Sequence, residues 1–445
     1  MRFAKRKRKW LRALVVVIGL LATALAVPFL VPLESYIPEL NKLVSEKIGQ
    51  PVSIRDLRLQ LLPTPRVAII GLKLGHKDEV SIERASIVPD LLLLLAGEYV
   101  VREIRADGIR VKASALDLLD KLPKGGGGRA ILVQRIVLRH VTYEQRTLRL
   151  PRFNVVVDLS VVPSATLVRF STDDGSFRAT LDPQEGGRTH LAITAHDWRL
   201  PFPVAPLRFD TLDAKGVLQG AQLDFPQVNG KLYGGTLSGS LDTRWDKGWR
   251  IGGKARIAGV QMIPLQAALG RPARLSGRLN AQVTYSAQAA TPGQLANALV
   301  LDAPFAVAGG EWHGVDLSRV AELPLGKLSP GGTTKYEQMK GQLALRGRKI
   351  QLNNLCLRSP SLVASGNVSI APDQTLSGKL DVAVAKTGGF VGVPVSLAGT
   401  TAEPSLSLTT AGAIGAVIGT VLLPGIGTSL GLQAGGRLEG KVECK

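Results

Sequence analysis

The residues of this chain that could carry chemistry are few and widely separated. The five histidines, His76, His140, His190, His196 and His313, include one close pair, His190 and His196, with no cysteine beside it. A protein zinc site takes its ligands at short spacings such as H-E-x-x-H or C-x-x-C, and neither pattern occurs. The histidines are therefore interpreted as ordinary surface residues, and we expect no metal and no cofactor.

Motifs for covalent catalysis and nucleotide binding are also absent. The segment Gly235–Gly239 places Ser238 one position too late for the G-x-S-x-G nucleophile elbow. The segment Gly378–Leu380 lacks the upstream glycine and the hydroxyl residue of a phosphate-binding loop. Asp173 and Asp174 are more typical of a turn than of a catalytic carboxylate pair. The sequence thus predicts that the protein is not an enzyme.

The two cysteines, Cys356 and Cys444, have no metal-binding spacing. In an oxidising compartment they could form one long-range disulfide. Two unreactive thiols fit the sequence equally well, because pairing cannot be read from the sequence alone.

The basic balance of the chain comes partly from its first residues. The 445 residues contain 55 Lys and Arg against 35 Asp and Glu, which gives a formal charge of +20. Seven basic residues crowd the first twelve positions, and the others are spread through alternating segments. A nucleic-acid-binding protein would show a concentrated basic stripe or a recognisable module. We therefore expect no nucleic-acid partner.

Residues 13–33 carry no charge and predict a membrane anchor. An α-helix needs ~20 apolar residues to cross ~30 Å of hydrocarbon, which this segment supplies. The preceding basic residues place the N-terminus in the cytoplasm and the bulk of the chain on the other side. The alternative is a cleaved signal peptide at Ala24–Ala26, although the apolar stretch continues beyond that site. The residues expected to contact lipid in the anchor are Leu14, Val17, Leu20, Leu21, Leu25 and Phe29.

Beyond the anchor, the pattern predicts many short strands and few helices. Helical spacing is found over 38–48 and ends at Gly49. A short helix or an apolar turn is expected over 91–97, and short helices over 115–122 and 291–299, the last with Thr291 as its N-cap. From Ile131 onward, apolar residues alternate with polar ones, which is typical of antiparallel strands with one dry face.

Composition divides the chain into successive segments. We expect a cytoplasmic basic tail at 1–12, a transmembrane helix at 13–33, an N-terminal β module at 34–124, a glycine linker at 125–128, a middle β segment at 129–225, a C-terminal β module at 226–410 and an apolar, glycine-rich tail at 411–445. Residues 411–432 of the tail are uncharged but are interrupted by Pro424 and Gly425. Each half is too short to span a bilayer, which leaves a re-entrant hairpin, a cap over the end of the sheet or a helix pair docked on the protein.

The order of short motifs along the chain resembles the AsmA family. In the N-terminal half these motifs are Gly49–Val52, Pro63–Pro65, Leu91–Gly97 and Val100–Ile104. In the C-terminal half they are Leu232–Gly239, the helix at 293–299, Gly309–Gly310, Gly314–Leu317 and Val393–Thr400 with Pro404. Glycine, proline and aliphatic residues make up most of these positions, so their order rather than any one motif carries the resemblance.

The resemblance implies a repeating-β-groove, bridge-like protein. The expected fold is mainly β, with an N-terminal transmembrane helix followed by a long curled antiparallel β-sheet groove and a few short helices. The expected function is phospholipid transfer toward the outer membrane, and outer-membrane homeostasis, by a single-pass protein of the bacterial inner membrane with its bulk in the periplasm. The implied partners are phospholipid or another lipid, the inner membrane, and outer-membrane or periplasmic proteins. The alternative is a non-transporting envelope factor that regulates assembly of outer-membrane proteins or glycolipid.

The clearest alternating segments supply candidates for the groove lining. They are Leu343, Leu345, Leu380, Val382, Val384, Val393, Val395, Leu397, Leu406 and Leu408. We expect these side chains to line the groove and to contact acyl chains. A shift of one residue in strand register would turn them to the opposite face.

Overall fold

A computed structural model describes residues 33–60, 64–115, 132–145, 150–159, 166–201, 206–318, 327–328, 331–386 and 389–409. The chain forms two compact units, Met1–Gly186 (unit 1) and Gly187–Lys445 (unit 2). The glycine linker predicted at 125–128 lies outside the described residues.

The described helices are short. They are η1 (Leu33–Tyr36), α2 (Ile37–Ile48), α3 (Leu91–Leu95), η2 (Ala113–Ala115), α5 (Met262–Ala268) and η3 (Pro292–Ala298). Of these, α3, α5 and η3 lie in connections between strands. Helix α2 confirms the prediction over 38–48, and it ends where Gly49 takes a left-handed conformation with φ of 71°. The segment at 291–299 forms a 3₁₀-helix, and Thr291 makes no side-chain capping bond. Residues 116–122 of the helix predicted at 115–122 lie outside the described residues, and α5 was not predicted.

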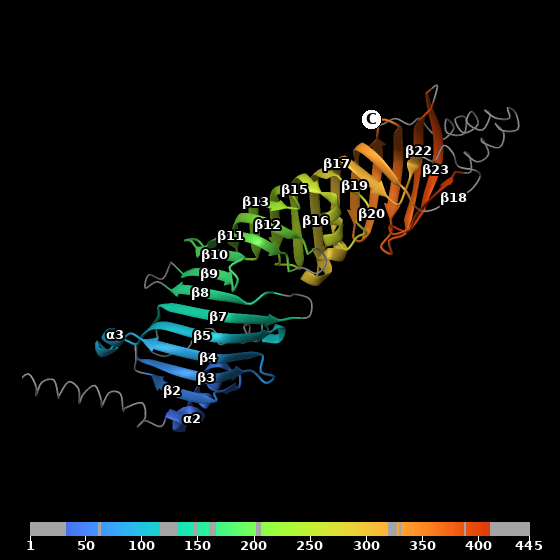
Figure 1. The fold of residues 1–445 in the computed structure, drawn as a ribbon. Helices are drawn as coiled ribbons and strands as arrows, with labels where there is room; N and C mark the ends of the chain where they lie inside the picture. Colours follow the sequence, from blue (N-terminus) through green and yellow to red (C-terminus); the bar gives the residue numbers. More distant parts are fainter. Residues whose placement is uncertain are drawn as a thin grey trace, which may run out of the picture. The chain divides into compact units, whose positions relative to one another are not determined.

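Unit 1 is built on a curled sheet (Figure 1). Its strands are β1 (Val52–Ser53), β2 (Asp56–Gln60), β3 (Arg66–Leu74), β4 (Val80–Pro89), β5 (Val100–Lys112), β6 (Leu132–Val133), β7 (Arg135–Glu144), β8 (Phe153–Leu159), β9 (Thr166–Thr172) and β10 (Phe177–Pro183). Strands β2, β3, β4 and β5 are antiparallel neighbours, as are β7, β8, β9 and β10. Strand β5 pairs in parallel with β6 and β7, which corrects the expectation of a wholly antiparallel sheet. A parallel pair requires a long connection, and the chain between Lys112 and Leu132 supplies one.

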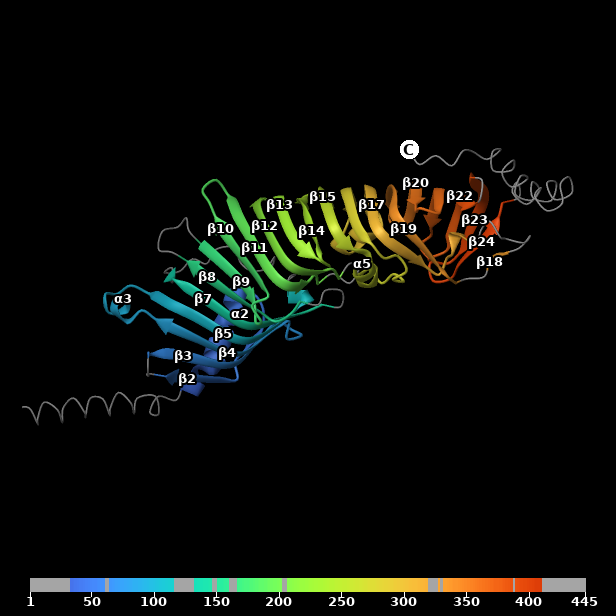
Figure 2. The ribbon, with the colours of Figure 1, turned by 45° about the horizontal axis from the view of Figure 1, so that its top comes forward.

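Unit 2 is an antiparallel meander with one exception (Figure 2). Its strands are β11 (Arg188–Arg199), β12 (Arg208–Gln219), β13 (Gln222–Leu232), β14 (Gly235–Arg244), β15 (Trp249–Gln261), β16 (Arg278–Ala289), β17 (Val300–His313), β18 (Lys327–Leu328), β19 (Thr333–Arg346), β20 (Lys349–Arg358), β21 (Leu362–Ile370), β22 (Leu376–Lys386), β23 (Gly389–Gly399) and β24 (Pro404–Leu408). Each strand pairs with the next along the chain, except that β17 pairs directly with β19. The short strand β18 pairs instead with β24, at the far end of the meander.

The predicted membrane anchor cannot be placed in this fold. Its expected lipid-facing residues Leu14, Val17, Leu20, Leu21, Leu25 and Phe29 lie outside the described residues, as does the tail at 411–445. Within the part of the chain that is described, no helix has both the length and the apolar character needed to cross a bilayer. The anchor therefore stays a prediction from the sequence.

Candidate functional site

Strand register gives the sheet of unit 2 two chemically different faces. One row of paired residues runs across eight strands without a polar side chain: Ala195, Leu212, Gly230, Leu237, Ile257, Ala281, Phe305 and Gly341. The row beside it points to the opposite face and is entirely polar: Thr194, Asp213, Asn229, Ser238, Arg256 and Gln282. We call the first face the inner face and the second the outer face. The polar row is exposed to solvent throughout.

Among the described residues, no second layer packs over the whole inner face of β11 to β16. Leu191, Ile193, Leu237, Leu241 and Ile257 are each half-buried, so part of each side chain still reaches solvent. A small core of Phe209, Leu232 and Val260 lies at one end of these strands. Outside that core, the inner face presents a shallow apolar surface on a curled sheet, which is the geometry of an open groove.

Glycines beneath aromatic rings shape this surface. A Cβ atom on Gly230 would lie 2.8 Å from the ring of Phe209, and one on Gly216 would lie 2.6 Å from the ring of Phe225. Real Cβ atoms do not approach so closely. Each ring therefore packs directly against the backbone at a position where any residue other than glycine would clash. The bulky rings therefore rest low on the inner face.

A tyrosine hydroxyl on the inner face is satisfied by the backbone. The Tyr285 hydroxyl donates to the Ser240 carbonyl oxygen at 2.9 Å. A Cβ on Gly253 would lie 2.7 Å from that hydroxyl, so glycine makes room for the bond. Burial raises the pKa of Tyr285, so this group remains a neutral donor at physiological pH.

Most of the predicted groove residues lie at a closed end of unit 2. Seven of them are between 0% and 7% exposed and pack against one another in a single core: Leu380, Val382, Val384, Val393, Val395, Leu397 and Leu406. Leu343, Leu345 and Leu408 are half-buried. At the seven buried positions the interior is filled by the protein's own side chains, and a lipid could enter only if that packing opened.

A segment that we call the plug, Gly314–Ser318, fills part of this interior. Val315 is 4% exposed and Leu317 is fully buried. Thr334 holds the segment from both sides, because its Oγ1 accepts from the Leu317 N–H at 2.9 Å and donates to the Val315 carbonyl at 2.8 Å. The pairing of β18 with β24 lies beyond the plug along the chain.

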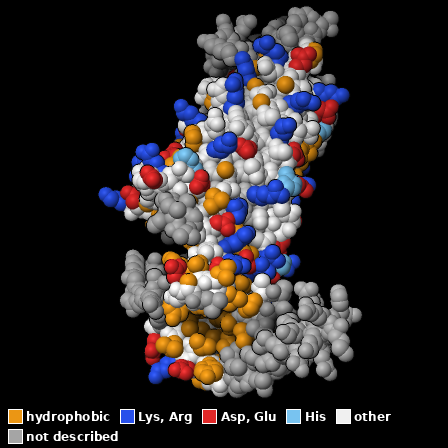
Figure 3. Space-filling model, turned by 90° about the vertical axis from the view of Figure 1, so that its left-hand side faces the viewer, with side chains coloured by type: hydrophobic (Ala, Val, Ile, Leu, Met, Phe, Trp, Pro, Cys, Tyr) orange, Lys and Arg blue, Asp and Glu red, His pale blue; other side chains and the backbone are white. Residues whose placement is uncertain are grey.

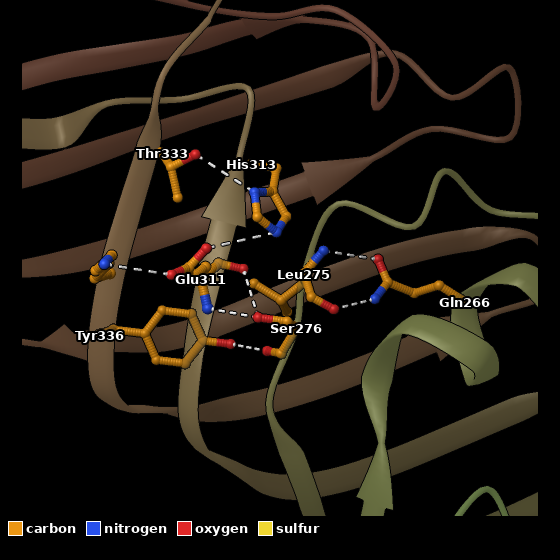
Figure 4. Close-up of polar contacts among 8 residues, drawn as sticks. Gln266, Leu275, Ser276, Glu311, His313, Thr333 and Tyr336 are labelled. Carbon is orange, nitrogen blue, oxygen red and sulfur yellow. Dashed lines mark hydrogen bonds and ion pairs between the residues drawn. The ribbon is translucent and has the colours of Figure 1, made fainter.

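A second segment, residues 269–277, follows α5 (Figure 4). We call this segment the strap. The Gln266 side chain donates to the Leu275 carbonyl at 2.5 Å and accepts from the Leu275 N–H at 3.3 Å. Leu275 packs against the closed core and forms a β-bridge with Trp312. Arg271 in the same segment donates to the side chain of Gln374, in the turn between β21 and β22. The strap therefore reaches from α5 to the far strands of the closed end.

Polar contacts fix the strap to β17 and β19 (Figure 4). Ser276 and Glu311 bond through their backbones, and the Glu311 N–H also donates to the Ser276 hydroxyl at 2.8 Å. The Tyr336 hydroxyl donates to the Ser276 carbonyl at 2.5 Å. The Glu311 carboxylate lies 3.7 Å from the Lys335 ammonium group and 3.9 Å from the His313 ring. These contacts join the strap to β17 and β19 and are structural.

Unit 1 carries the most uniform apolar row in the described chain. Its members pair in sequence across eight strands: Leu59, Val67, Ile87, Ile104, Ile136, Val157, Val168 and Leu181. All eight are aliphatic and all eight are half-buried. On the same face, a core of Ala85, Ala106, Ile109 and Val141 lies closer to the opposite ends of the strands. Unit 1 thus has an apolar inner face that is only partly covered.

The described residues offer little for metal or acid–base chemistry. No group of three or more His, Cys, Asp or Glu side chains within the described ranges could hold a metal ion. The strongest carboxyl shift is at Asp174, whose hydrogen bonds from Thr172 and Ser176 lower its pKa to about 2. That residue lies in the β9–β10 hairpin, where such bonds are ordinary turn contacts.

One family comparison bears on this architecture. Residues 202–355 match the AsmA family. The matched segment begins before β12 and ends within β20, so it includes the open inner face of unit 2 from β12 to β16, the strap and the plug. The expected resemblance to AsmA proteins is confirmed over this stretch. No curated protein and no solved structure matches the chain.

Alternation in the sequence identified apolar faces but not which of them are open. The row in unit 1 was missed because its members lie on eight separate strands, and only the register brings them together. The signal was present in each strand, as in Val155–Val157–Leu159, but no local pattern orders the strands. The strap gave no signal, and the plug contributed only the motif Gly314–Leu317 to the family resemblance, because short irregular segments have no periodicity.

Proposed function

We propose that the AsmA-like chain carries phospholipid acyl chains on its partly covered inner faces and passes lipid from the inner membrane toward the outer membrane. The observation that carries the proposal is the half-buried aliphatic row of unit 1, from Leu59 to Leu181, together with the apolar row of unit 2. In a soluble domain such surfaces are normally covered by a second layer. In this protein, a bound acyl chain would cover these two apolar surfaces.

The physical basis is the hydrophobic effect, which favours the burial of apolar surface and requires no directed bond. Each methylene removed from water contributes about 0.8 kcal/mol, and the contribution does not depend on a particular partner atom. An aliphatic row that continues across many strands therefore offers similar binding at each position. A lipid can move along such a surface over small barriers while its headgroup stays in water. No catalytic group is needed for that movement.

Two features support an extracytoplasmic location. Cys356 is disulfide-bonded, and disulfides persist mainly in oxidising compartments such as the periplasm. The uncharged segment at 13–33 follows a basic tail, as in a helix inserted with its N-terminus in the cytoplasm. We therefore place the protein in the inner membrane with its two units in the periplasm.

A charge on the inner face provides the test. We expect Leu237→Glu to lower the phospholipid retained by the purified full-length protein by about half, because an unpaired carboxylate would face acyl chains on unit 2 while the inner face of unit 1 is unchanged. The matched control is Ser238→Glu, which places the same charge one residue away on the exposed outer face. Native mass spectrometry of both variants in the same detergent measures bound lipid.

Two outcomes would contradict the proposal. Unchanged lipid retention in Leu237→Glu would show that lipid does not lie on the inner face of unit 2. Absence of lipid from the unsubstituted protein, with polypeptide recovered in its place, would favour the non-transporting envelope factor, which could bind partner strands at a sheet edge.

A further inference from the structure

The connection between β4 and β5 in unit 1 exposes an unusual amount of apolar surface. We call Leu91–Leu95 with Tyr99 and Leu132 the leucine tip. Leu92 is 77% exposed, Leu91 and Leu94 are each 42% exposed, and Tyr99 and Leu132 are 50% and 57% exposed. Contiguous exposed apolar side chains of this kind mark a surface that binds a partner or a membrane.

Local hydrogen bonds fix the conformation of the leucine tip. The Asp90 carboxylate accepts from the Leu93 N–H at 3.4 Å and caps α3. The Glu98 N–H donates to the Leu93 carbonyl at 2.9 Å, which closes the turn after the helix. The Leu132 N–H donates to the Tyr99 carbonyl at 3.2 Å and brings β6 beside the tip. The exposed leucines therefore lie on an ordered, hydrogen-bonded turn.

The N-terminal end of the described chain enters unit 1 at the same rim as the leucine tip. The Ser45 hydroxyl accepts from the Val52 N–H at 2.9 Å, and the Asn41 side chain accepts from the Ile54 N–H at 3.0 Å. Helix α2 thus runs antiparallel to the following strands, so earlier helix residues lie beside later strand residues. Segment η1, at the start of the helix, accordingly contacts β2.

The register of the sheet then relates that end of β2 to the leucine tip. Gln60, the last residue of β2, pairs with Arg66, the first residue of β3. The next pair along, Val67 and Ile87, lies two residues before β4 ends at Pro89 and the chain enters α3. Residue 33 and the leucine tip therefore lie toward one rim, and the β3–β4 turn at 75–79 lies at the other.

We propose that the leucine tip inserts into the interfacial region of the bilayer that the segment at 13–33 crosses. This inference rests on the proposed membrane anchorage, because the segment predicted to span the bilayer ends at Leu33, on the same rim. Leucine side chains offer no hydrogen-bonding groups to a protein partner, whereas tyrosine is enriched at the membrane–water interface. Arg102, which is 55% exposed and 3.6 Å from Asp90, can reach lipid phosphates from the same strand end.

Figure 3 looks at the molecule from the side on which α3 lies in Figure 1, and it shows hydrophobic side chains gathered over unit 1. The aliphatic row of unit 1 passes close to this rim, since Ile87 lies two residues from the end of β4. An acyl chain that leaves the bilayer at the leucine tip would meet that row next. The tip thus gives the proposed lipid pathway its entry point.

A depth measurement on the full chain tests the insertion. Leu92→Cys is labelled with the environment-sensitive dye NBD, and the protein is reconstituted into vesicles of phosphatidylethanolamine and phosphatidylglycerol at about 3:1. The matched control is His76→Cys, an exposed position in the β3–β4 turn at the opposite rim. The unsubstituted chain, treated with the dye in parallel, gives the background labelling, and circular dichroism checks that each variant folds.

We expect doxyl-labelled lipids to quench the dye at position 92 at least about twofold more than the dye at position 76. Equal quenching at the two positions would overturn the proposal. A dye at position 92 that is shielded from water but not quenched by lipid would also overturn it, and would point to a protein partner or a second copy of the chain. Lipid retention in native mass spectra of the same preparations separates this result from the carrier proposal, which can hold even if the tip does not insert.

Discussion

At the scale of single residues, two partly buried tyrosine hydroxyls of unit 2 are satisfied by backbone atoms. The Tyr285 and Tyr336 hydroxyls donate to the carbonyls of Ser240 and Ser276, and burial raises the pKa of both tyrosines. The first bond lies on the open inner face, and the second fixes the strap at the closed end. A polar group left unsatisfied in either place would cost more than the bond contributes, which explains why each tyrosine has a partner.

Removal of the Tyr336 hydroxyl tests the role of the strap. We expect Tyr336→Phe to lower the free energy of unfolding by about 1 kcal/mol near pH 8, because the bond to Ser276 is lost. The raised pKa means that the folded protein keeps this proton above pH 10, where the unfolded chain releases it. The contribution is therefore full below about pH 10 and is lost as the pH rises further. Urea unfolding at pH 8 and 10.5 should show the gap between the two proteins narrowing, and a gap that widens would contradict this account.

At the scale of elements, two segments that leave the sheet add side chains to the closed core of unit 2. The strap and the plug both lie inside the stretch matched by the AsmA family, and Leu275, Val315 and Leu317 pack in the same core as residues of β19 to β24. The closed end is thus filled both by the strands and by two short irregular segments.

The plug provides a matched pair of substitutions. We expect Leu317→Ala to lower the free energy of unfolding by about 3 kcal/mol, because it leaves a cavity in a sealed core. Leu343→Ala removes the same atoms from a half-buried position on the inner face and should cost about 1 kcal/mol. Urea unfolding of both variants measures the difference. Equal, small losses would show that the plug does not seal the interior.

At the scale of the whole molecule, the sequence predicted the strand content and the two chemically distinct faces. Alternation was enough for that, since Val382 and Leu343 each follow the pattern expected of an inward-facing residue. It could not separate them, because Val382 belongs to a core with side chains such as Leu317, which is distant in sequence and follows no period. The parallel pairing of β5 with β7 was missed for a related reason, since both strands have ordinary strand patterns and only the long connection between them sets their direction.

The central claim is that lipid occupies the open inner faces and not the sealed core. Photo-leucine, which differs little from leucine in size, can replace the leucines of the full-length protein, and irradiation in its native membrane then links bound lipid to the nearest side chains. We expect phospholipid adducts on Leu237 and Leu241 of unit 2 and on Leu59 of unit 1, and none on Leu380 or Leu397. Mass spectrometry of the digested protein maps the adducts. Adducts confined to the sealed leucines, or absent from every inner-face leucine, would contradict the account.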